Sequence, residues 1–412
     1  MKRRVKTLIL VAGIALVMYG AHSFYLANKN PLMSDTAQTV DTRQILPQKL
    51  FDKNWHVIKD EYYDSSFNHQ HWSRWKNHYQ NKIKTADDVK VATDTMLASL
   101  DDPYSRFLTK DDFIKQRTNI SSKICGIGVT IVNEAGKIKV IDVMDKAPAQ
   151  FADIKSGDII LAVNGKDING LSVSQVSNLV KGPQNTLVSL DVLRGDKKII
   201  KQIVRKEIAI KSIKSSVQDE IGYIQISSFI SSTVPNEFLE ALENTSKAKG
   251  LIIDLRGNTG GLLSNAVFIA NLFIDDGKLV SIVGRNGYHY DVMAQNKNVN
   301  INKPVVILVD NTSASATEIL AGALKDYHRA KLVGTKTYGK GMVQKIIPMP
   351  NETALNLTIA KYLTPHGSDI NKRGINPDLR VNFTKSDFET RTDGQLEKAK
   401  NILGKMLISK VQ

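Results

Sequence analysis

The stretch from Lys303 to Tyr327, KPVVILVDNTSASATEILAGALKDY, decides the fold of the second half of this 412-residue chain. It opens with a run of valine, isoleucine and leucine, which is typical of a strand in a sheet covered on both faces. A polar turn containing Ser313 and Ser315 follows, and apolar residues then recur at helical spacing. A buried strand that turns directly into an amphipathic helix predicts a layered α/β core.

The same alternation of strand and helix runs through residues 209–383. A second apolar run, LIIDL, also fits a strand covered on both faces of its sheet. From the periodicity we expect helices at 233–248 and 262–274, and strands at 221–229, 249–258, 303–310, 331–350, 354–365 and 379–383.

Two further regions precede this core, so the chain is predicted to be an α+β protein of several domains. Residues 47–118 show helical spacing of apolar side chains, and Thr85 stands before acidic residues as a helix cap would. Residues 121–208 contain short β-type runs separated by turns, with helical pieces at 147–153 and 172–182. That second pattern predicts a small module of strands with two helices.

The first 27 residues have the composition of an export segment. The basic start MKRR is followed by the uncharged stretch TLILVAGIALVMYGA, as in a secretory signal. A retained signal-anchor is an equal alternative, because residues 8–27 are nearly long enough to span a bilayer. Both interpretations place the rest of the chain outside the cytoplasm, in the bacterial periplasm or cell envelope. Residues 28–46 then indicate a linker, and residues 384–412 a C-terminal helical tail.

The composition argues against several classes of protein. The net charge is +15, but no basic run is interleaved with aromatic residues, so nucleic-acid binding is not expected. Cys125 is the only cysteine, which rules out an intramolecular disulfide and a cysteine metal cluster. The histidines of the helical region lack the H-E-x-x-H spacing of a zinc site. We therefore expect neither a metal nor a cofactor.

A glycine-rich turn, DLRGNTGG at residues 254–261, ends one of the predicted buried strands. Such a turn at the start of a helix can direct backbone N–H groups at an anion, either a phosphate or a developing oxyanion. The Lys of a phosphate-binding loop is missing here, so nucleotide binding is disfavoured. The alternative is a tight turn without a ligand.

The turn with Ser313 and Ser315 lies where the positive end of the helix dipole stabilises negative charge. A serine placed there becomes a nucleophile if a base takes its proton. No histidine lies in a convincing sequence context, but Lys340 stands between two glycines just before an apolar strand. A lysine desolvated in that position would have a lowered pKa and could act as the base. Helix capping by the serines and a solvated loop lysine remain the alternatives at this point.

The module at 121–208 resembles a bacterial PDZ domain in CGIGVTI and in APAQFADIKSGDIILAVNGKDI. It departs from the family pattern where Asp153 and Ile154 replace the usual Gly-Leu. Gly126 and Gly128 would leave backbone N–H groups free to hold a peptide carboxylate, while Ile127 and Val129 would face an apolar pocket for the last side chain. A simple glycine turn is the alternative.

The whole stretch from about residue 45 to 383 resembles the carboxyl-terminal processing peptidases, also called tail-specific proteases. The resemblance rests on EYYD, MLASLDDPYSRFLT, DLRGNTGGLL, SASATEILAGALKD, GTKTYGKGMVQ and LTIAKYLTPHGSDINKRGINPDLRV, in the family's order. It implies a crotonase/ClpP-like layered core and a Ser/Lys dyad in place of a Ser-His-Asp triad.

The resemblance assigns roles residue by residue. Ser315 matches the nucleophile and Lys340, 25 positions later, matches the base. Gln344 matches the residue that orients the lysine by hydrogen bonding. The oxyanion hole would be formed by the N–H groups of Ala316 and Gly261, with Gly260 as the alternative to Gly261. Ser313 is then left with a local hydrogen bond or a capping role.

The implied function is that of an exported serine endopeptidase, which recognises C-terminal tails of proteins through its PDZ domain and works through an acyl-enzyme. The expected partners are proteins and peptides with apolar C-termini, and not nucleic acids. Self-association through the helical termini, and membrane contact through residues 1–27 if they are retained, are also expected. A non-catalytic PDZ scaffold and an acyl-CoA enzyme of the crotonase type are the alternatives.

Overall fold

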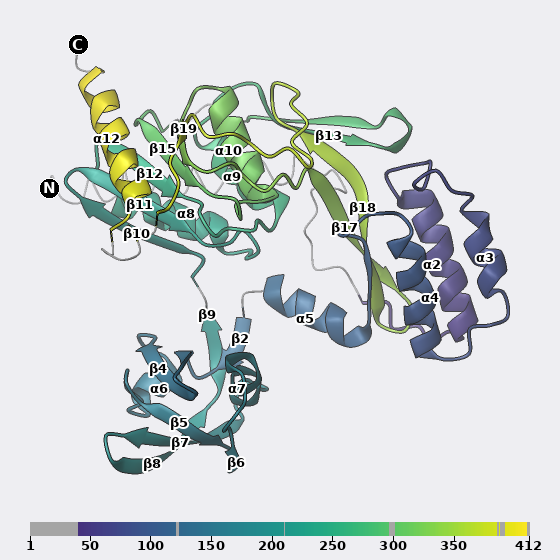
Figure 1. Ribbon diagram of the computed structural model, residues 1–412, viewed down its shortest axis with the longest axis horizontal. Helices are drawn as coiled ribbons and strands as arrows, with labels where there is room; N and C mark the ends of the chain where they lie inside the picture. Colours follow the sequence, from purple (N-terminus) through teal and green to yellow (C-terminus); the bar gives the residue numbers. More distant parts are fainter. Residues whose placement is uncertain are drawn as a thin grey trace, which may run out of the picture. The chain divides into compact units, whose positions relative to one another are not determined.

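The computed structural model describes residues 40–120, 123–209, 211–295, 301–384, 387 and 392–409. The chain divides into a core unit, Met1–Ile120 with Lys211–Gln412, and an inserted unit, Ser121–Ile210 (Figure 1). The expected export segment at residues 1–27 lies outside the described residues. Among the helices that are described, none is long and apolar enough to cross a membrane.

The core unit is built on a six-stranded sheet in the order β10-β11-β12-β15-β16-β19. All neighbouring strands are parallel except β10 and β11. Every residue of β12 and β15 is buried, as the apolar runs predicted. The strands are β10 (Ile213–Gln218), β11 (Ile221–Ile226), β12 (Gly250–Asp254), β15 (Val305–Val309), β16 (Lys331–Gly334) and β19 (Leu379–Arg380).

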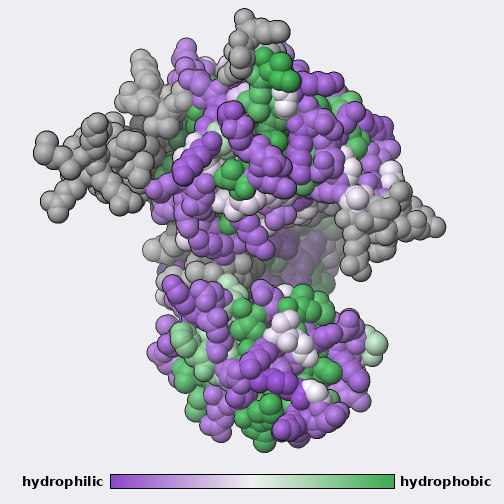
Figure 2. Space-filling view, turned by 90° about the vertical axis from the view of Figure 1, so that its left-hand side faces the viewer, coloured by the Kyte–Doolittle hydropathy of each residue, from purple (hydrophilic) through white to green (hydrophobic). Residues whose placement is uncertain are grey.

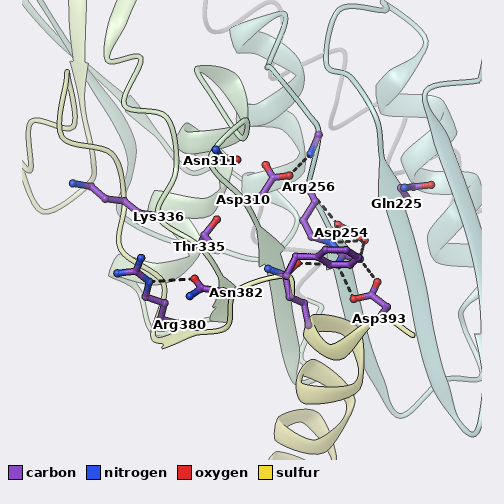
Figure 3. A pocket seen from close by; sticks show the side chains of 13 residues that line it. Gln225, Asp254, Arg256, Asp310, Asn311, Thr335, Lys336, Arg380, Asn382 and Asp393 are labelled. Atoms are coloured by element: carbon purple, nitrogen blue, oxygen red, sulfur yellow. Dashed lines mark hydrogen bonds and ion pairs between the residues drawn. The ribbon is translucent and has the colours of Figure 1, made fainter. Parts of the chain in front are cut away.

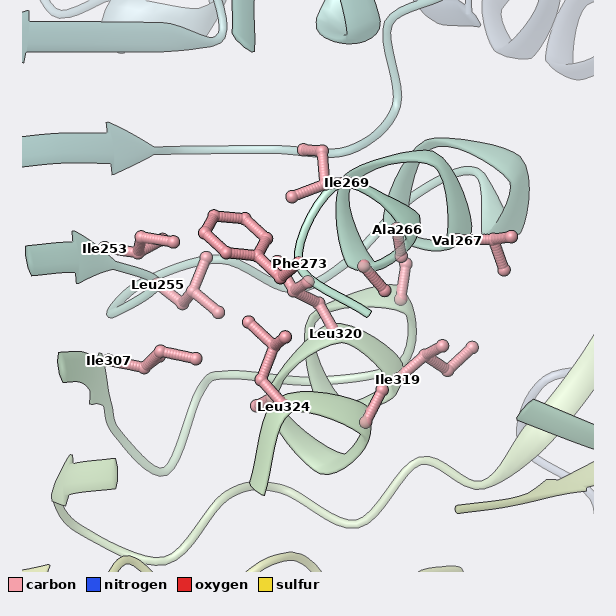
Figure 4. Close-up of a cluster of buried hydrophobic side chains, with 14 of the residues drawn as sticks. Ile253, Leu255, Ala266, Val267, Ile269, Phe273, Ile307, Ile319, Leu320 and Leu324 are labelled. Carbon is pink, nitrogen blue, oxygen red and sulfur yellow. The ribbon is translucent and has the colours of Figure 1, made fainter. Parts of the chain in front are cut away.

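Helices cover both faces of this sheet. On one face lie α8 (Val234–Asn244), α9 (Leu263–Asn271) and α10 (Ala316–Asp326). Figure 4 shows Leu320 and Leu324 of α10 directed toward Ile253 and Ile307 of the sheet, with Phe273 beside them. Together these side chains form the main hydrophobic core of the unit.

The opposite face of the sheet is covered by α12 (Gly394–Ser409). Ala399 and Leu403 of this helix are fully buried against strand residues such as Ile252 and Val306. The predicted C-terminal helical tail is therefore a layer of the core. Its expected part in self-association stays a prediction.

A second sheet of antiparallel strands lies beside the first in the core unit. Its central strand β18 pairs with β1, β13 and β17, and β13 pairs with β14. The sequence predicted strands only in the regions of β17 and β18. The strands are β1 (Arg106–Leu108), β13 (Lys278–Gly284), β14 (His289–Met293), β17 (Met342–Met349) and β18 (Thr353–Leu363).

The helical N-terminal region packs on this second sheet (Figure 1). It consists of α2 (Pro47–Glu61), α3 (Ser73–Tyr79), α4 (Ala86–Ala98) and α5 (Lys110–Ile120). The predicted cap of α4 is confirmed, because the Thr85 side chain accepts the Asp88 N–H and the Asp88 carboxylate accepts the Thr85 N–H. The loop between α4 and β1 contacts β18, because the Tyr104 carbonyl accepts the Asn356 side-chain amide.

The inserted unit is a small antiparallel sheet with two helices. The strand order is β3-β4-β5-β7-β8, with β6 paired to β5, so β3 is an edge strand of this sheet, while β2 and β9 form a separate two-stranded sheet. Val140 and Val176 belong to its core. The elements are β2 (Lys123–Gly126), β3 (Val129–Glu134), β4 (Lys137–Val143), α6 (Pro148–Phe151), β5 (Ile159–Val163), β6 (Lys166–Asp167), α7 (Val173–Val180), β7 (Leu187–Arg194), β8 (Lys197–Val204) and β9 (Lys206–Ala209).

Candidate active site

Ser313 and Ser315 lie on one turn between β15 and α10 but have different surroundings. Ser313 is fully buried. Its Oγ donates to the Leu255 carbonyl at 2.9 Å and accepts the Asp310 N–H at 3.0 Å. The expectation of a local hydrogen-bonding role for Ser313 is confirmed, since both bonds fasten the turn to the strands around it.

Ser315 is half-buried and stands directly before Ala316, the first residue of α10. Its backbone has φ 59° and ψ −120°, a region that residues other than glycine rarely occupy. Two contacts hold it there: its N–H donates to Glu318 Oε2 at 2.9 Å, and its carbonyl accepts the Tyr362 hydroxyl at 3.0 Å. A strained serine at a helix N-terminus is the arrangement by which a sharp turn exposes a nucleophilic hydroxyl.

Glu318 joins the serine turn to the loop that carries Lys340. Its carboxylate is fully buried and accepts four hydrogen bonds. Besides the Ser315 N–H, the donors are the N–H groups of Gly339 and Lys340, both at 2.8 Å, and the Thr337 hydroxyl at 2.6 Å. Sequence reasoning missed this residue. The sequence pattern that could have identified Glu318 is an acid three positions after a serine at the start of a helix, which is the capping-box pattern.

The Lys340 loop is packed tightly against residues 370–374. A Cβ atom on Gly341 would lie 2.8 Å from the Asn371 nitrogen, and one on Gly339 would lie 2.7 Å from the Gly374 nitrogen. The two glycines beside Lys340 therefore permit a close approach of two backbones, as the sequence indicated.

The Lys340 side chain is half-buried and does not project freely into solvent. Burial lowers the pKa of its amine; the Asp102 carboxylate opposes this shift and Arg106 adds to it. The Nζ atom lies 4.7 Å from the centre of the Tyr104 ring. Because a lysine must be neutral to accept a proton, the lowered pKa suits the role of a general base.

Tyr362 makes a second connection between the two loops. Its hydroxyl lies 2.6 Å from the Lys340 carbonyl and 3.0 Å from the Ser315 carbonyl. Burial raises its pKa well above the usual value, so the phenol keeps the proton that it shares between these carbonyls. Together with Glu318 it fixes the backbones of both candidate catalytic residues.

The glycine-rich turn after β12 lies against the serine turn. A Cβ atom on Gly260 would be 2.8 Å from the Ser315 Cβ. The buried Asn258 shapes the turn, because its Oδ1 accepts the Gly260 N–H at 2.9 Å and its carbonyl accepts the Ala314 N–H at 3.1 Å. The Gly260 N–H is thus already engaged.

Gly261 forms a parallel bridge with Phe229, in which the Gly260 carbonyl and the Leu262 N–H make the hydrogen bonds. In this pattern the bridging residue's own N–H points to the other side of the chain. The pairing therefore favours Gly261 over Gly260 as an oxyanion donor.

Gln344 lies on β17, four residues after Lys340. Its Nε2 donates to Thr358 Oγ1 on β18 at 3.3 Å. Within the described part of the chain, this is its hydrogen-bonding partner, and the Lys340 amine faces Tyr104 instead.

A pocket of about 770 Å³ opens at the carboxyl ends of β12, β15 and β16 (Figure 3). Arg256 crosses it and binds Asp254 and Asp393, and the Tyr223 hydroxyl donates to Asp254 at 2.7 Å. Neither candidate catalytic side chain lines this pocket. Its ion pairs fasten the start of α12 to the sheet.

The predicted peptide-binding residues of the inserted unit run from the end of β2 to the start of the edge strand β3. The Ile127 side chain is buried in the unit's core, whereas Val129 is only partly buried. The carbonyls of Ile127 and Gly128 are occupied by the N–H groups of Ala149 and Met144. Gly128 has φ +78°, and a Cβ there would lie 2.3 Å from the Ala147 Cβ. Gly126, the last residue of β2, is paired with Lys206 of β9.

A strained serine at the start of a helix, a half-buried lysine and a nearby glycine turn fit a serine peptidase. Comparison with known proteins agrees: the family model for peptidase family S41 matches residues 220–381, and the PDZ domain model matches residues 125–202. The carboxyl-terminal-processing protease of Synechocystis sp. is 34% identical over 371 residues, which cover 86% of each chain.

The carboxy-terminal processing protease CtpA of Bacillus subtilis is 35% identical over 387 residues, which cover 92% of this chain and 78% of the relative. Among solved structures, the photosystem II D1 C-terminal processing protease matches with a TM-score of 0.56 and 30% identity, over 82% of this chain and 94% of that one. The chain belongs to peptidase family S41, as a serine-type C-terminal processing peptidase with a PDZ domain. Its substrates are proteins or peptides, and membership excludes the acyl-CoA alternative.

Proposed function

We propose that this peptidase cleaves exported proteins near their C-termini, with Ser315 as nucleophile and Lys340 as general base. The observation that carries the proposal is the shared carboxylate of Glu318, which accepts the N–H groups of both residues. It brings two segments 25 positions apart into one site, where burial lowers the pKa of the lysine.

The reaction follows from the placement of these groups. Neutral Lys340 takes the proton of the Ser315 hydroxyl, whose oxygen attacks the substrate carbonyl. The N–H groups of Ala316 and Gly261 stabilise the oxyanion, and removal of either would cost about a hundredfold in rate. Lys340 then protonates the leaving amine as the acyl-enzyme forms, and water hydrolyses the ester. Gln344 is proposed to orient the lysine when substrate is bound.

Substrate recognition is assigned to the inserted unit. Among the described strands of its sheet, β3 pairs only with β4, so an extended peptide could add to the sheet beside α7. Gly126 to Val129 would hold the terminal carboxylate and the last side chain. On the face drawn in Figure 2, hydrophobic areas of this unit are separated by hydrophilic ones, and its exposed apolar residues include Phe151, Leu187 and Ile200. Apolar tails are the expected ligands.

The location and assembly of the enzyme belong to the same proposal. Residues 1–27 would direct the chain out of the cytoplasm and, if retained, hold it at the membrane. The helical termini would support self-association. The proposed domain boundaries are 47–118 for the helical region, 121–208 for the PDZ domain and 209–383 for the peptidase core.

The test compares the wild-type enzyme with Ser315→Ala and Lys340→Ala on an unfolded protein that ends in an apolar tail. Fragments are measured by intact mass. Both variants should lose about a thousandfold or more in cleavage rate while keeping their thermal stability. Equal cleavage by all three proteins would refute the dyad. If the wild type cleaves nothing, even with an activating tail peptide, the chain acts as a binding scaffold.

A further inference from the structure

The loop between α4 and β1 carries Tyr104 to the candidate active site. Both sides of its backbone are held: the Tyr104 N–H donates to Asp102 Oδ1 at 3.0 Å, and its carbonyl accepts Asn356 Nδ2 at 3.0 Å. Asn356 belongs to β18, the central strand of the second sheet. The position of the tyrosine is therefore set by that sheet.

The next residue of the loop is fixed as well. Ser105 Oγ donates to Asp102 Oδ2 at 2.6 Å and accepts the Thr358 N–H at 2.9 Å. Thr358 is the residue that accepts the Gln344 side chain. A continuous set of hydrogen bonds thus joins the Tyr104 loop to the strand that follows Lys340.

Held in this way, the Tyr104 ring faces the Lys340 amine, with Nζ 4.7 Å from its centre. At this distance the face of an aromatic ring attracts an ammonium group much more strongly than a neutral amine. The charged groups that also act on this amine are Asp102 and Arg106, of opposite sign. Glu318 is turned to the backbone donors already described. The ring is therefore the neutral group suited to support the charge.

The ring itself does not ionise at the pH of the reaction. Burial raises the pKa of Tyr104 to about 12, and the neighbouring Tyr338 hydroxyl contributes to this shift. A neutral ring stabilises the ammonium without holding it as a carboxylate would, so the amine can still release its proton.

We propose that Tyr104 is a positioning residue whose ring face holds the protonated amine of Lys340. The proposal rests on the proposed role of Lys340 as base, because the amine becomes an ammonium after it takes the serine proton. The ring would then hold this cation until the amine protonates the leaving group. The helical N-terminal region thereby completes the active site.

The test uses Tyr104→Leu, which keeps an apolar cover but removes the ring, and Tyr104→Phe, which removes only the hydroxyl. In full-length protein with Ser315→Ala, acetylation of Lys340 by trace acetic anhydride is followed by mass spectrometry across pH. Loss of the ring should lower the apparent pKa of the amine by about half a unit to one unit. Tyr104→Phe should leave it unchanged. With Ser315 present, the acid limb of kcat/KM should move to lower pH in Tyr104→Leu alone.

An unchanged amine titration in Tyr104→Leu would overturn the proposal, as would an equal shift in Tyr104→Phe, which would assign the effect to the hydroxyl. Thermal unfolding confirms that each variant is folded; Tyr104 is only half-buried, so truncation should be tolerated. If the amine titration shifts but the acid limb of cleavage does not, the ring contact is established and the role of Lys340 as base is refuted.

Discussion

The two loops that supply the candidate catalytic side chains are stabilised in different ways. In the serine turn, residues 310–316, the Asp310 carboxylate accepts the N–H groups of Thr312 and Ser313 within the turn itself. The lysine loop, residues 335–341, instead places its N–H groups on Glu318, a residue of α10. The serine turn thus has hydrogen bonds of its own besides the contacts of Ser315 with Glu318 and Tyr362, whereas the N–H groups of Gly339 and Lys340 depend on Glu318. The lysine loop should be the easier of the two to displace.

The strongest way to break this arrangement is Glu318→Gln, which removes the charge and turns an N–H₂ group toward backbone donors. At least one buried donor would lose its partner, at about 1–3 kcal/mol per group. We expect cleavage to fall about a hundredfold or more. Urea unfolding should show a loss of about 3 kcal/mol or more. The exposed Glu243→Gln is the matched control. Near-normal activity in Glu318→Gln would mean that the loops do not depend on this carboxylate.

Gly341→Ala tests the lysine loop alone. The added methyl would lie 2.8 Å from the Asn371 nitrogen, so one of the two backbones must shift and Lys340 with it. We expect kcat to fall about tenfold, since a displacement of about 1 Å at a catalytic group has effects of this size or larger. Binding of tail peptides to the inserted unit should not change.

The control for that substitution is Gly404→Ala in α12, where a Cβ meets no atom within 4 Å. It should keep full activity and gain up to about 1 kcal/mol in stability, because alanine favours a helix. Equal kcat in both glycine variants would show that the lysine loop tolerates movement.

The same contrast explains what the sequence could predict. The β15-turn-α10 unit follows from local periodicity, because a buried parallel strand and an amphipathic helix each leave a regular apolar pattern. β14 has no regular apolar pattern, since HYDVM becomes a strand only by pairing with β13. Tertiary pairing of this kind cannot be deduced from a local window.

The site divides in the same way. Ser315 and Lys340 were assigned through family resemblance, because capping alone explained both serines equally well. Glu318 and Tyr104 were not identified as site residues from the sequence, since their partners come from segments distant in sequence. The choice between Gly260 and Gly261 as oxyanion donor depended on Asn258, because its side chain accepts the Gly260 N–H and so engages it. Such choices are set by hydrogen bonds that a spacing does not reveal.

Ser313→Ala sharpens the comparison within the serine turn. It would leave the Leu255 carbonyl and the Asp310 N–H without their buried partner, at a cost of about 1–3 kcal/mol. Activity should fall less than tenfold, because the nucleophile is still present. Ser315→Ala should do the opposite and abolish cleavage with little change in stability. Thermal unfolding and cleavage assays on the same preparations separate the two, and similar profiles would contradict the division of roles.

The smallest expected effect concerns the cost of placing Lys340 in a buried site. Burial lowers the pKa of its amine in the folded protein, so the unfolded chain binds the proton more tightly. The folded state is therefore least stable below the lowered pKa, and it gains stability as the pH rises from there toward the ordinary value near 10.5.

Lys340→Met should raise Tm by a few degrees at pH 7, and this gain should vanish near pH 10.5. Lys336→Met, at an exposed position of the same loop, should show no such pH-dependent gain. If Lys340→Met lowers Tm at neutral pH, stabilisation of the ammonium by the Tyr104 ring and Asp102 outweighs the cost of burying it. The Lys340 amine would then be protonated in the resting enzyme and would have to lose this proton when substrate binds.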